Sequence, residues 1–310
     1  MKKINFAEPN INKIEKYYLN KAIDSKWISK GAYVDLFEKN ICKLMGTKYS
    51  LSTNNGTSAL LLILMSLGIK KGDEIIVPSM CYVSPIHMIK LIGAKPVAVD
   101  VENDTFQINP NNIKKKISKK TKAILTIHNF GGISDINKIE NIAVKNNINI
   151  IEDISETLLS KIGNQYVGSS KNKKLKKIAF SSLHATKTLT TGEGGFIITN
   201  KKQDYINLKK LRDHGIKDSS KYFYDKVGGN FRLSNLLAAI GCAQLLKVKE
   251  IEKKKIFLNS IYIKKFKNNK SIDIQSTNIN SRLIKWGFPV KFKNKLIRKK
   301  ILKKLNKYSV

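Results

Sequence analysis

The chain has 310 residues, of which 42% are hydrophobic, and this is enough for one large domain and a smaller one. Its formal net charge is +35, from 58 Lys and Arg against 23 Asp and Glu. A nucleic-acid binder gathers such charge on one face or in a tail, whereas these lysines are dispersed. We therefore expect no specific nucleic-acid recognition, and we interpret the basic runs 171–177 and 295–304 as solvated faces.

The cysteines and the apolar runs exclude other classes of protein. Cys42, Cys81 and Cys242 are far apart and form no CxxC pair, so the sequence predicts neither a disulfide framework nor a zinc site. The first residues lack the apolar core of a signal peptide, and no apolar run reaches membrane-spanning length. We expect a cytoplasmic protein with no membrane partner.

The first half of the chain alternates predicted helices and strands. Apolar residues recur at helical spacing in 11–22 and 33–45, and compact apolar strands follow. The predicted strands are 74–78, 96–101, 123–127 and 148–152, with helices up to 92, at 111–117 and at 135–145. This alternation predicts an α/β fold with a mostly parallel central sheet flanked by helices and right-handed crossovers.

An early helix start is a candidate phosphate site. A short strand near Ser50 meets Asn55-Gly56-Thr57-Ser58 and continues as an apolar helix. The free N–H groups of such a start, aided by a hydroxyl, suit a phosphate. Thr57 or Ser58 would equally well be a simple helix cap.

Two side chains are predicted at the carboxyl edge of the sheet, where open α/β sheets bind ligands. Tyr82 comes just after the strand 74–78, and its ring could stack on a planar cofactor or simply pack. Asp153 closes the strand 148–152, and a carboxylate there can keep a pyridine nitrogen protonated. Glu152 and Glu156 flank Asp153, so the residues alone also fit a solvated acidic cluster.

Lys187 precedes a glycine-rich turn, between predicted strands 177–182 and 195–199. A lysine in a partly dry pocket can lose its proton, and the neutral amine can bond an aldehyde, which is how enzymes anchor pyridoxal phosphate. Most of the other lysines must be surface charge, so Lys187 alone would be weak evidence.

The last third of the chain divides differently. A helix beginning near Asp204 is followed by Gly228-Gly229-Asn230, which opens a long apolar helix up to Leu246. A basic amphipathic helix then precedes strand-like pieces at 272–274 and 283–290 and a basic helix up to 304. We predict a large cofactor-binding domain over 1–247, including an N-terminal helical segment, and a small α+β domain over 248–310.

Several motifs, in order over about residues 4 to 265, resemble the DegT/DnrJ/StrS-type sugar aminotransferases, which are fold-type-I pyridoxal-phosphate enzymes acting on nucleotide-linked keto sugars. The matching stretches are Trp27-Ile28-Ser29, Asn55 to Leu60, Gly72 to Ser79, Glu152-Asp153, His184 to Lys187, Thr191 to Gly195, Leu211 to Gly215 and Asn230 to Leu233. One such motif is weak evidence, but the ordered set is strong. The pattern is most similar to perosamine-synthase-like members.

The resemblance implies a role for each candidate residue. Lys187 would be the catalytic lysine that bonds the cofactor and moves protons, and Asp153 would pair with the pyridinium nitrogen. Glu156 would lie near the phenolic oxygen of the cofactor, and Tyr82 would stack on its ring. The phosphate would be held by Gly56, Thr57, Ser58 and Ser182. Asn230 would reach the cofactor phosphate of a neighbouring subunit, which implies a homodimer with shared sites.

The resemblance also implies the reaction and its partners. We expect transfer of an amino group, from glutamate, to C4 of a nucleotide-diphosphate-linked 4-keto-6-deoxy sugar, for surface polysaccharide or lipopolysaccharide synthesis. Relatives generally run tens of residues further, so we expect the small domain to be truncated. One alternative is a non-catalytic or truncated member that binds the cofactor or a nucleotide sugar. Another is a sugar dehydratase on the same fold, in which a histidine replaces the anchoring lysine.

Overall fold

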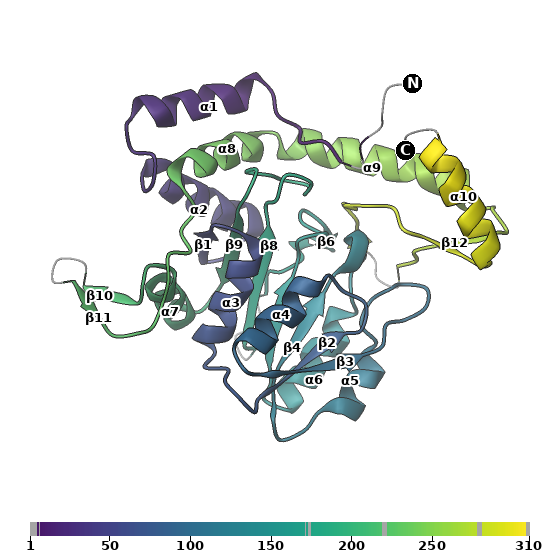
Figure 1. Cartoon of the computed structure of the whole chain (residues 1–310), viewed down its shortest axis with the longest axis horizontal. Helices are drawn as coiled ribbons and strands as arrows, with labels where there is room; N and C mark the ends of the chain where they lie inside the picture. Colours follow the sequence, from purple (N-terminus) through teal and green to yellow (C-terminus); the bar gives the residue numbers. More distant parts are fainter. Residues whose placement is uncertain are drawn as a thin grey trace.

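The structure is a computed structural model that describes residues 5, 7–170, 172, 175–218, 222–277 and 281–307. Its centre is a seven-stranded sheet in the order β1-β9-β8-β5-β4-β2-β3 (Figure 1). The strands are β1 (Tyr49–Thr53), β2 (Glu74–Pro78), β3 (Lys95–Val99), β4 (Thr121–Ile127), β5 (Asn149–Asp153), β8 (Lys177–Ser182) and β9 (Gly195–Thr199). Within this sheet, β9 runs antiparallel to its neighbours β1 and β8, and all other neighbouring strands pair in parallel. The predicted, mostly parallel sheet is therefore confirmed.

Helices cover both faces of the sheet. One face packs α3 (Gly56–Ser66), α4 (Val83–Leu91) and α7 (Lys202–Arg212) onto strand residues such as Ile75 and Leu125. The other face packs α5 (Pro110–Lys116) and α6 (Ile136–Lys145) onto Ile76, Ile124 and Ile150. Successive strand residues point to opposite faces, and the central strands β2, β4 and β5 carry apolar residues on both, as a buried parallel sheet requires.

A helical layer lies beside the β1 edge. It consists of α1 (Lys13–Asp24), α2 (Ala32–Met45), α8 (Asn235–Leu246) and α9 (Val248–Phe266), and α8 packs against α1 and α2 (Figure 1). Gln244 and Lys247 both bind the buried Glu15 carboxylate, which ties α8 to α1. Lys247 lies between α8 and α9, where we place the domain boundary. That boundary stays a prediction.

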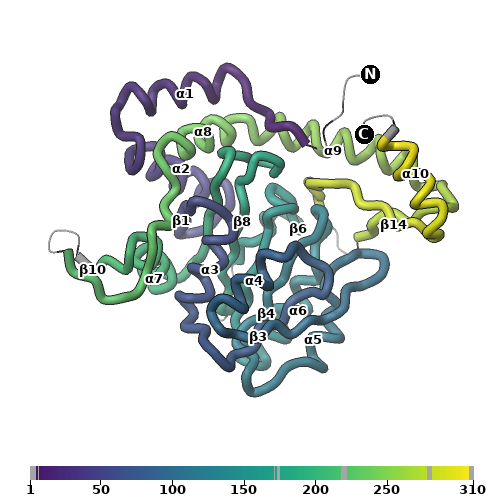
Figure 2. Tube along the Cα trace, in the orientation of Figure 1, coloured from purple at the N-terminus to yellow at the C-terminus, as the bar shows by residue number. Residues whose placement is uncertain are grey.

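Short hairpins complete the fold (Figure 2). The hairpin of β10 (Ile216–Asp218) and β11 (Phe223–Tyr224) projects beside α7, and β12 (Ile272–Ile274) pairs with β14 (Val290–Phe292) next to α10 (Lys295–Lys307). A three-stranded sheet joins β6 (Lys161–Ile162), β7 (Gln165–Tyr166) and β13 (Ser281–Arg282). Within the described ranges, no helix has the length and apolar character needed to cross a bilayer.

The predicted strand at 283–290 is wrong for most of its length. Only Val290 lies in a strand, at the start of β14. The preceding residues bond to the loop that follows β5, with the Ile284 amide donating to Ser160 Oγ (2.8 Å) and the Trp286 amide to the Glu156 carbonyl (3.3 Å). Alternate apolar residues in this segment pack against the rest of the chain, and this gives the same sequence pattern as a strand.

Candidate active site

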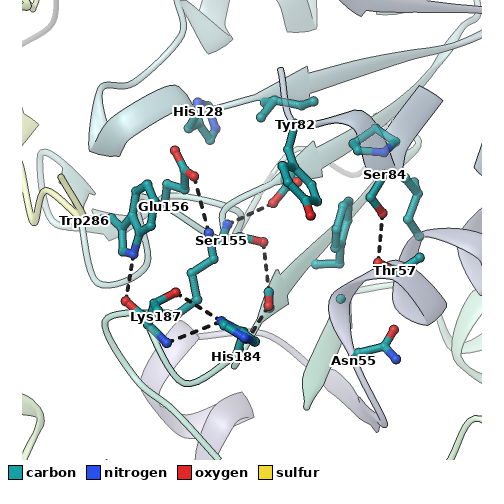
Figure 3. A pocket seen from close by; sticks show the side chains of 18 of the residues that line it. Asn55, Thr57, Tyr82, Ser84, His128, Ser155, Glu156, His184, Lys187 and Trp286 are labelled. Atoms are coloured by element: carbon teal, nitrogen blue, oxygen red, sulfur yellow. Dashed lines mark hydrogen bonds and ion pairs between the residues drawn. The ribbon is translucent and has the colours of Figure 1, made fainter. Parts of the chain in front are cut away.

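A cavity of about 400 Å³ opens at the carboxyl ends of β4, β5 and β8 and at the start of α3 (Figure 3). Strand ends are the expected position for a ligand in a sheet of this kind. Most of the residues that the sequence singled out line this cavity: Gly56, Thr57, Tyr82, Asp153, Glu156, Ser182 and Lys187. Residues separated by up to 131 positions are therefore brought to one site.

Asp153 is the last residue of β5 and forms part of the cavity wall. Burial raises the pKa of its carboxyl, although hydrogen bonds from Ser155 and the positive charge of Lys187 act in the opposite direction. The Ser155 amide donates to Asp153 Oδ1 at 2.9 Å, which fixes the carboxylate at the strand end. A partly desolvated acid of this kind suits a cationic ring nitrogen.

Lys187 lies on the loop between β8 and β9, and its side chain is only 16% exposed. The Lys187 amide donates to the His184 carbonyl at 2.8 Å, which holds the backbone in a tight turn. Its Nζ lies 3.3 Å from Glu156 Oε1 and 4.3 Å from the centre of the Trp286 ring. The amine thus points into the cavity, held by a carboxylate and an aromatic face (Figure 3).

The start of α3 provides a hydroxyl-rich cradle. Thr57 Oγ1 and Ser84 Oγ lie 2.8 Å apart, and the Ser182 amide donates to Ser155 Oγ at 2.9 Å. A methyl group on Gly56 would lie 2.9 Å from Ser182 Cβ, so only glycine permits this close approach of α3 and β8. Hydroxyls beside a helix start fit a phosphate.

Three further predicted cofactor-binding residues lie at the mouth of the cavity or outside its lining. Tyr82 lies at the mouth, 77% exposed, where its ring can cover a planar ligand. Ser58 is buried and does not line the cavity, and its amide donates to Asn55 Oδ1 at 2.7 Å. The structure therefore gives no support to a direct ligand contact by Ser58. Asn230 is exposed and lies outside the cavity lining, so its predicted contact with a partner's cofactor stays a prediction.

The cavity wall includes polar and aromatic residues to which the sequence analysis gave no role, among them Ser84, His128, Ser155, His184 and Trp286. His128 follows β4 as Asp153 closes β5, so the same edge rule could have found it. Trp286 gives no such signal, because it follows no strand and lies 99 positions after Lys187.

His128 connects the cavity to a buried charge network behind it. The Ser134 amide donates to His128 Nδ1 (3.1 Å), so Nε2 carries the proton and donates to Glu152 Oε1 (3.0 Å). Lys177 Nζ lies 2.7 Å from Glu152 Oε2 and 3.0 Å from Glu140. Burial works to raise the pKa of Glu152, but Lys177 and His128 outweigh it and lower the pKa to about 2.

Comparison with known proteins identifies the family. The model of the DegT/DnrJ/EryC1/StrS aminotransferases matches residues 9–310. The chain belongs to this family. GDP-perosamine synthase of Escherichia coli O157:H7 is 38% identical over 265 residues, which are 85% of this chain and 71% of that protein. The Vibrio cholerae enzyme of the same name is 35% identical over 256 residues, or 82% and 68%.

Solved structures agree with the family assignment. Helicobacter pylori PseC, an aminotransferase of pseudoaminic acid biosynthesis, superposes with a TM-score of 0.91 at 28% identity, covering 99% of this chain and 83% of that one. E. coli GDP-4-keto-6-deoxy-D-mannose-3-dehydratase, with bound hydrated PLP, gives a TM-score of 0.90 at 26% identity, covering 100% and 85%. The predicted fold and family of this aminotransferase are thereby confirmed.

Proposed function

We propose that this aminotransferase moves an amino group from glutamate to the C4 keto group of a nucleotide-linked 4-keto-6-deoxy sugar, with pyridoxal 5'-phosphate as cofactor. The observation that carries the proposal is the pairing of one amine, Lys187, with one acid, Asp153, in a single cavity at adjacent strand ends. Relatives at 35–38% identity are GDP-perosamine synthases, which supports a nucleotide-linked sugar as the acceptor.

The cavity fits this cofactor at three points. The Thr57, Ser84 and Ser182 hydroxyls offer a phosphate cradle, and Gly56 leaves the space for it. Asp153 offers an acid for a ring nitrogen, and Lys187 offers a primary amine. The bound cofactor supplies an electron-withdrawing ring that stabilises negative charge on a substrate carbon.

Each residue then has a task. Asp153 would pair with the ring nitrogen, and the positive charge there would compensate the desolvation of its carboxylate. Lys187 would hold the cofactor through Nζ and, as a free amine, would move a proton between two carbons. Tyr82, at the exposed mouth, would cover the ring and limit the access of water.

The finer partners rest on the resemblance. Glutamate is the proposed amino donor, and a homodimer is proposed in which Asn230 reaches the cofactor phosphate of the second subunit. The exposed position of Asn230 leaves it accessible for such a contact. The expected role is the synthesis of surface polysaccharide, and the expected cytoplasmic location stays a prediction.

A dehydratase is the second candidate because one structural neighbour is a sugar 3-dehydratase with nearly the same fold. Lys187 favours amino transfer, since the dehydratase branch places histidine at the anchoring position. A non-catalytic binding protein would keep the cavity but show no turnover. These three outcomes are separable in one assay.

The experiment combines spectroscopy and mass spectrometry. The purified protein is loaded with pyridoxal phosphate and incubated with glutamate and a panel of nucleotide-linked 4-keto-6-deoxy sugars, beginning with GDP-4-keto-6-deoxymannose. An amino sugar and 2-oxoglutarate are the expected products, and Lys187→Ala is expected to lose both the covalent link and the turnover. A deoxygenated sugar would favour the dehydratase, and cofactor binding without product would favour the binding protein.

A further inference from the structure

Glu156 and Trp286 form a small compartment around the Lys187 amine. Glu156 comes three residues after the end of β5, while Trp286 comes from the carboxyl-terminal segment that docks onto the large domain (Figure 3). Glu156 Oε1 lies 3.3 Å from Lys187 Nζ, and the indole ring centre lies 4.3 Å from it. A carboxylate and an aromatic face both attract an ammonium group, so this compartment holds the Lys187 side chain in one position.

The carboxylate of Glu156 is held in place by the backbone. Its Oε2 accepts a hydrogen bond from the Phe130 amide at 2.7 Å, which leaves Oε1 directed at Lys187. Phe130 has a positive φ of 59°, a conformation that costs a non-glycine residue some energy. In this conformation the Phe130 N–H points at the Glu156 carboxylate.

Trp286 is fixed equally well. Its Nε1 donates to the Thr186 carbonyl at 2.8 Å, next to Lys187 in sequence, and its amide donates to the Glu156 carbonyl. Gly131 permits this contact, because a methyl group there would lie 2.5 Å from the Lys285 Cα and 3.0 Å from the Trp286 amide nitrogen. Trp286 thus contacts both partners of the pair, with its indole on Lys187 and its backbone amide on the Glu156 carbonyl.

An ammonium ion has no lone pair, so Lys187 must lose a proton before it can bond an aldehyde. Resting on the proposed function, we propose that Glu156 is the proton acceptor for Lys187 when the cofactor is captured, and that Trp286 positions the amine for this transfer. This role differs from the contact with the phenolic oxygen that the family resemblance implies for Glu156.

The protons balance in this step. Glu156 takes one of the three protons of the Lys187 ammonium, and the freed lone pair forms the bond to the aldehyde carbon. Two protons, one from the nitrogen and one returned by Glu156, leave with the aldehyde oxygen as water. The third proton stays on the nitrogen of the new carbon–nitrogen double bond, so Glu156 ends in its original state.

The test measures the rate of covalent capture, without any turnover. Apo-protein is mixed with pyridoxal phosphate in a stopped-flow spectrometer, and the adduct is confirmed on Lys187 by borohydride reduction and peptide mass spectrometry. Glu156→Gln is expected to slow capture by about 10²-fold, the usual size of a general-base effect. The glutamine oxygen can still accept from the Phe130 amide, so the fold is retained. Glu250→Gln, on the exposed start of α9, is expected to capture at the wild-type rate.

Three further variants distinguish proton transfer by Glu156 from a purely structural effect. Glu156→Ala is expected to capture slowly and to be accelerated by added acetate, because a free carboxylate can replace the lost base. Trp286→Leu is expected to slow capture by about tenfold, while Trp286→Phe, which keeps an aromatic face, recovers most of the rate. Acceleration by acetate and recovery by phenylalanine are not expected if Glu156 and Trp286 only support the fold.

The outcomes are distinct. Capture by Glu156→Gln at the wild-type rate, or a slow Glu156→Ala that acetate does not accelerate, overturns this inference while the proposed function stands. A wild-type protein that takes up no pyridoxal phosphate overturns the proposed function and this inference together.

Discussion

Lys177 and Glu152 form a buried ion pair of 2.7 Å directly behind the candidate active site, with only 5% and 1% of their side chains exposed. Glu152 also accepts from His128, whose ring lines the cavity, and from the Gly168 amide at 2.9 Å. The ion pair therefore connects β8 and β5 with His128, a residue of the cavity wall.

Removing Lys177 is expected to be strongly destabilising, because it leaves the Glu152 charge buried without its main cation. Lys177→Met should lower the free energy of unfolding by about 3–5 kcal/mol in urea denaturation. Lys95→Met is the matched control, since Lys95 is 73% exposed and pairs with Glu74 at 3.6 Å. We expect that control to change stability by at most about 1 kcal/mol. Equal effects of the two variants would contradict the prediction.

The same pair predicts acid sensitivity. The pKa of Glu152 is lowered from 4.5 to about 2, so its ionised form is favoured by folding. This contribution is on the order of 3 kcal/mol, is fully present above pH 4.5 and is lost as the pH falls toward 2. Glu152→Gln should flatten this part of the profile of stability against pH, measured by urea unfolding at each pH. An unchanged acid limb would refute the assignment.

Asp153→Asn tests the ring-nitrogen partner. Asparagine keeps an oxygen that can accept from the Ser155 amide, but it removes the negative charge. We expect covalent uptake of pyridoxal phosphate by Lys187 to persist, while amino transfer from glutamate falls by about 10²-fold or more. Single-turnover absorbance of the loaded enzyme measures both steps. A variant with wild-type transfer would exclude Asp153 as the ring partner.

Gly56→Ala tests the phosphate cradle. The added methyl group would lie 2.9 Å from Ser182 Cβ, so α3 and β8 must move apart. We expect at least about tenfold weaker binding of pyridoxal phosphate, with a loss of unfolding free energy of about 1–3 kcal/mol. Equilibrium dialysis gives the affinity. Ser66→Ala, at the far end of α3, serves as the control and should leave the affinity unchanged.

Gly131→Ala tests the docking of the carboxyl-terminal segment. Gly131 has a φ of +83°, and a methyl group there would lie 2.5 Å from the Lys285 Cα. In a Trp27→Phe background Trp286 is the sole tryptophan, and its fluorescence should become more accessible to iodide in the Gly131→Ala variant. Quenching that remains at the parental level would show that the contact survives.

Much of the site followed from residue order because parallel strands end at one edge. Asp153, Tyr82 and Lys187 each come after an apolar strand, and the sheet brings these strand ends together. The sequence alone could not distinguish a phosphate ligand from a buried helix residue. Ser58 and Thr57 looked equivalent as sequence, but the helix phase buries the first and turns the second to the cavity.

The carboxyl-terminal segment was not predictable in the same way. Leu283 to Val290 alternates like a strand, yet its amides bond to Ser160 and Glu156 in loops of the large domain. Such contacts depend on two distant surfaces meeting, and no local periodicity encodes them. Trp286 and its contact with Lys187 could therefore be found only in the folded chain.

Trp286 is synthesised after the other residues that surround the Lys187 amine. A ribosome releases the glycine turn at Gly56, the acid at Asp153 and the amine at Lys187 well before the indole that encloses this amine. The indole can enclose the Lys187 amine only after residue 286 has been synthesised, so loading of pyridoxal phosphate should be most efficient after that point.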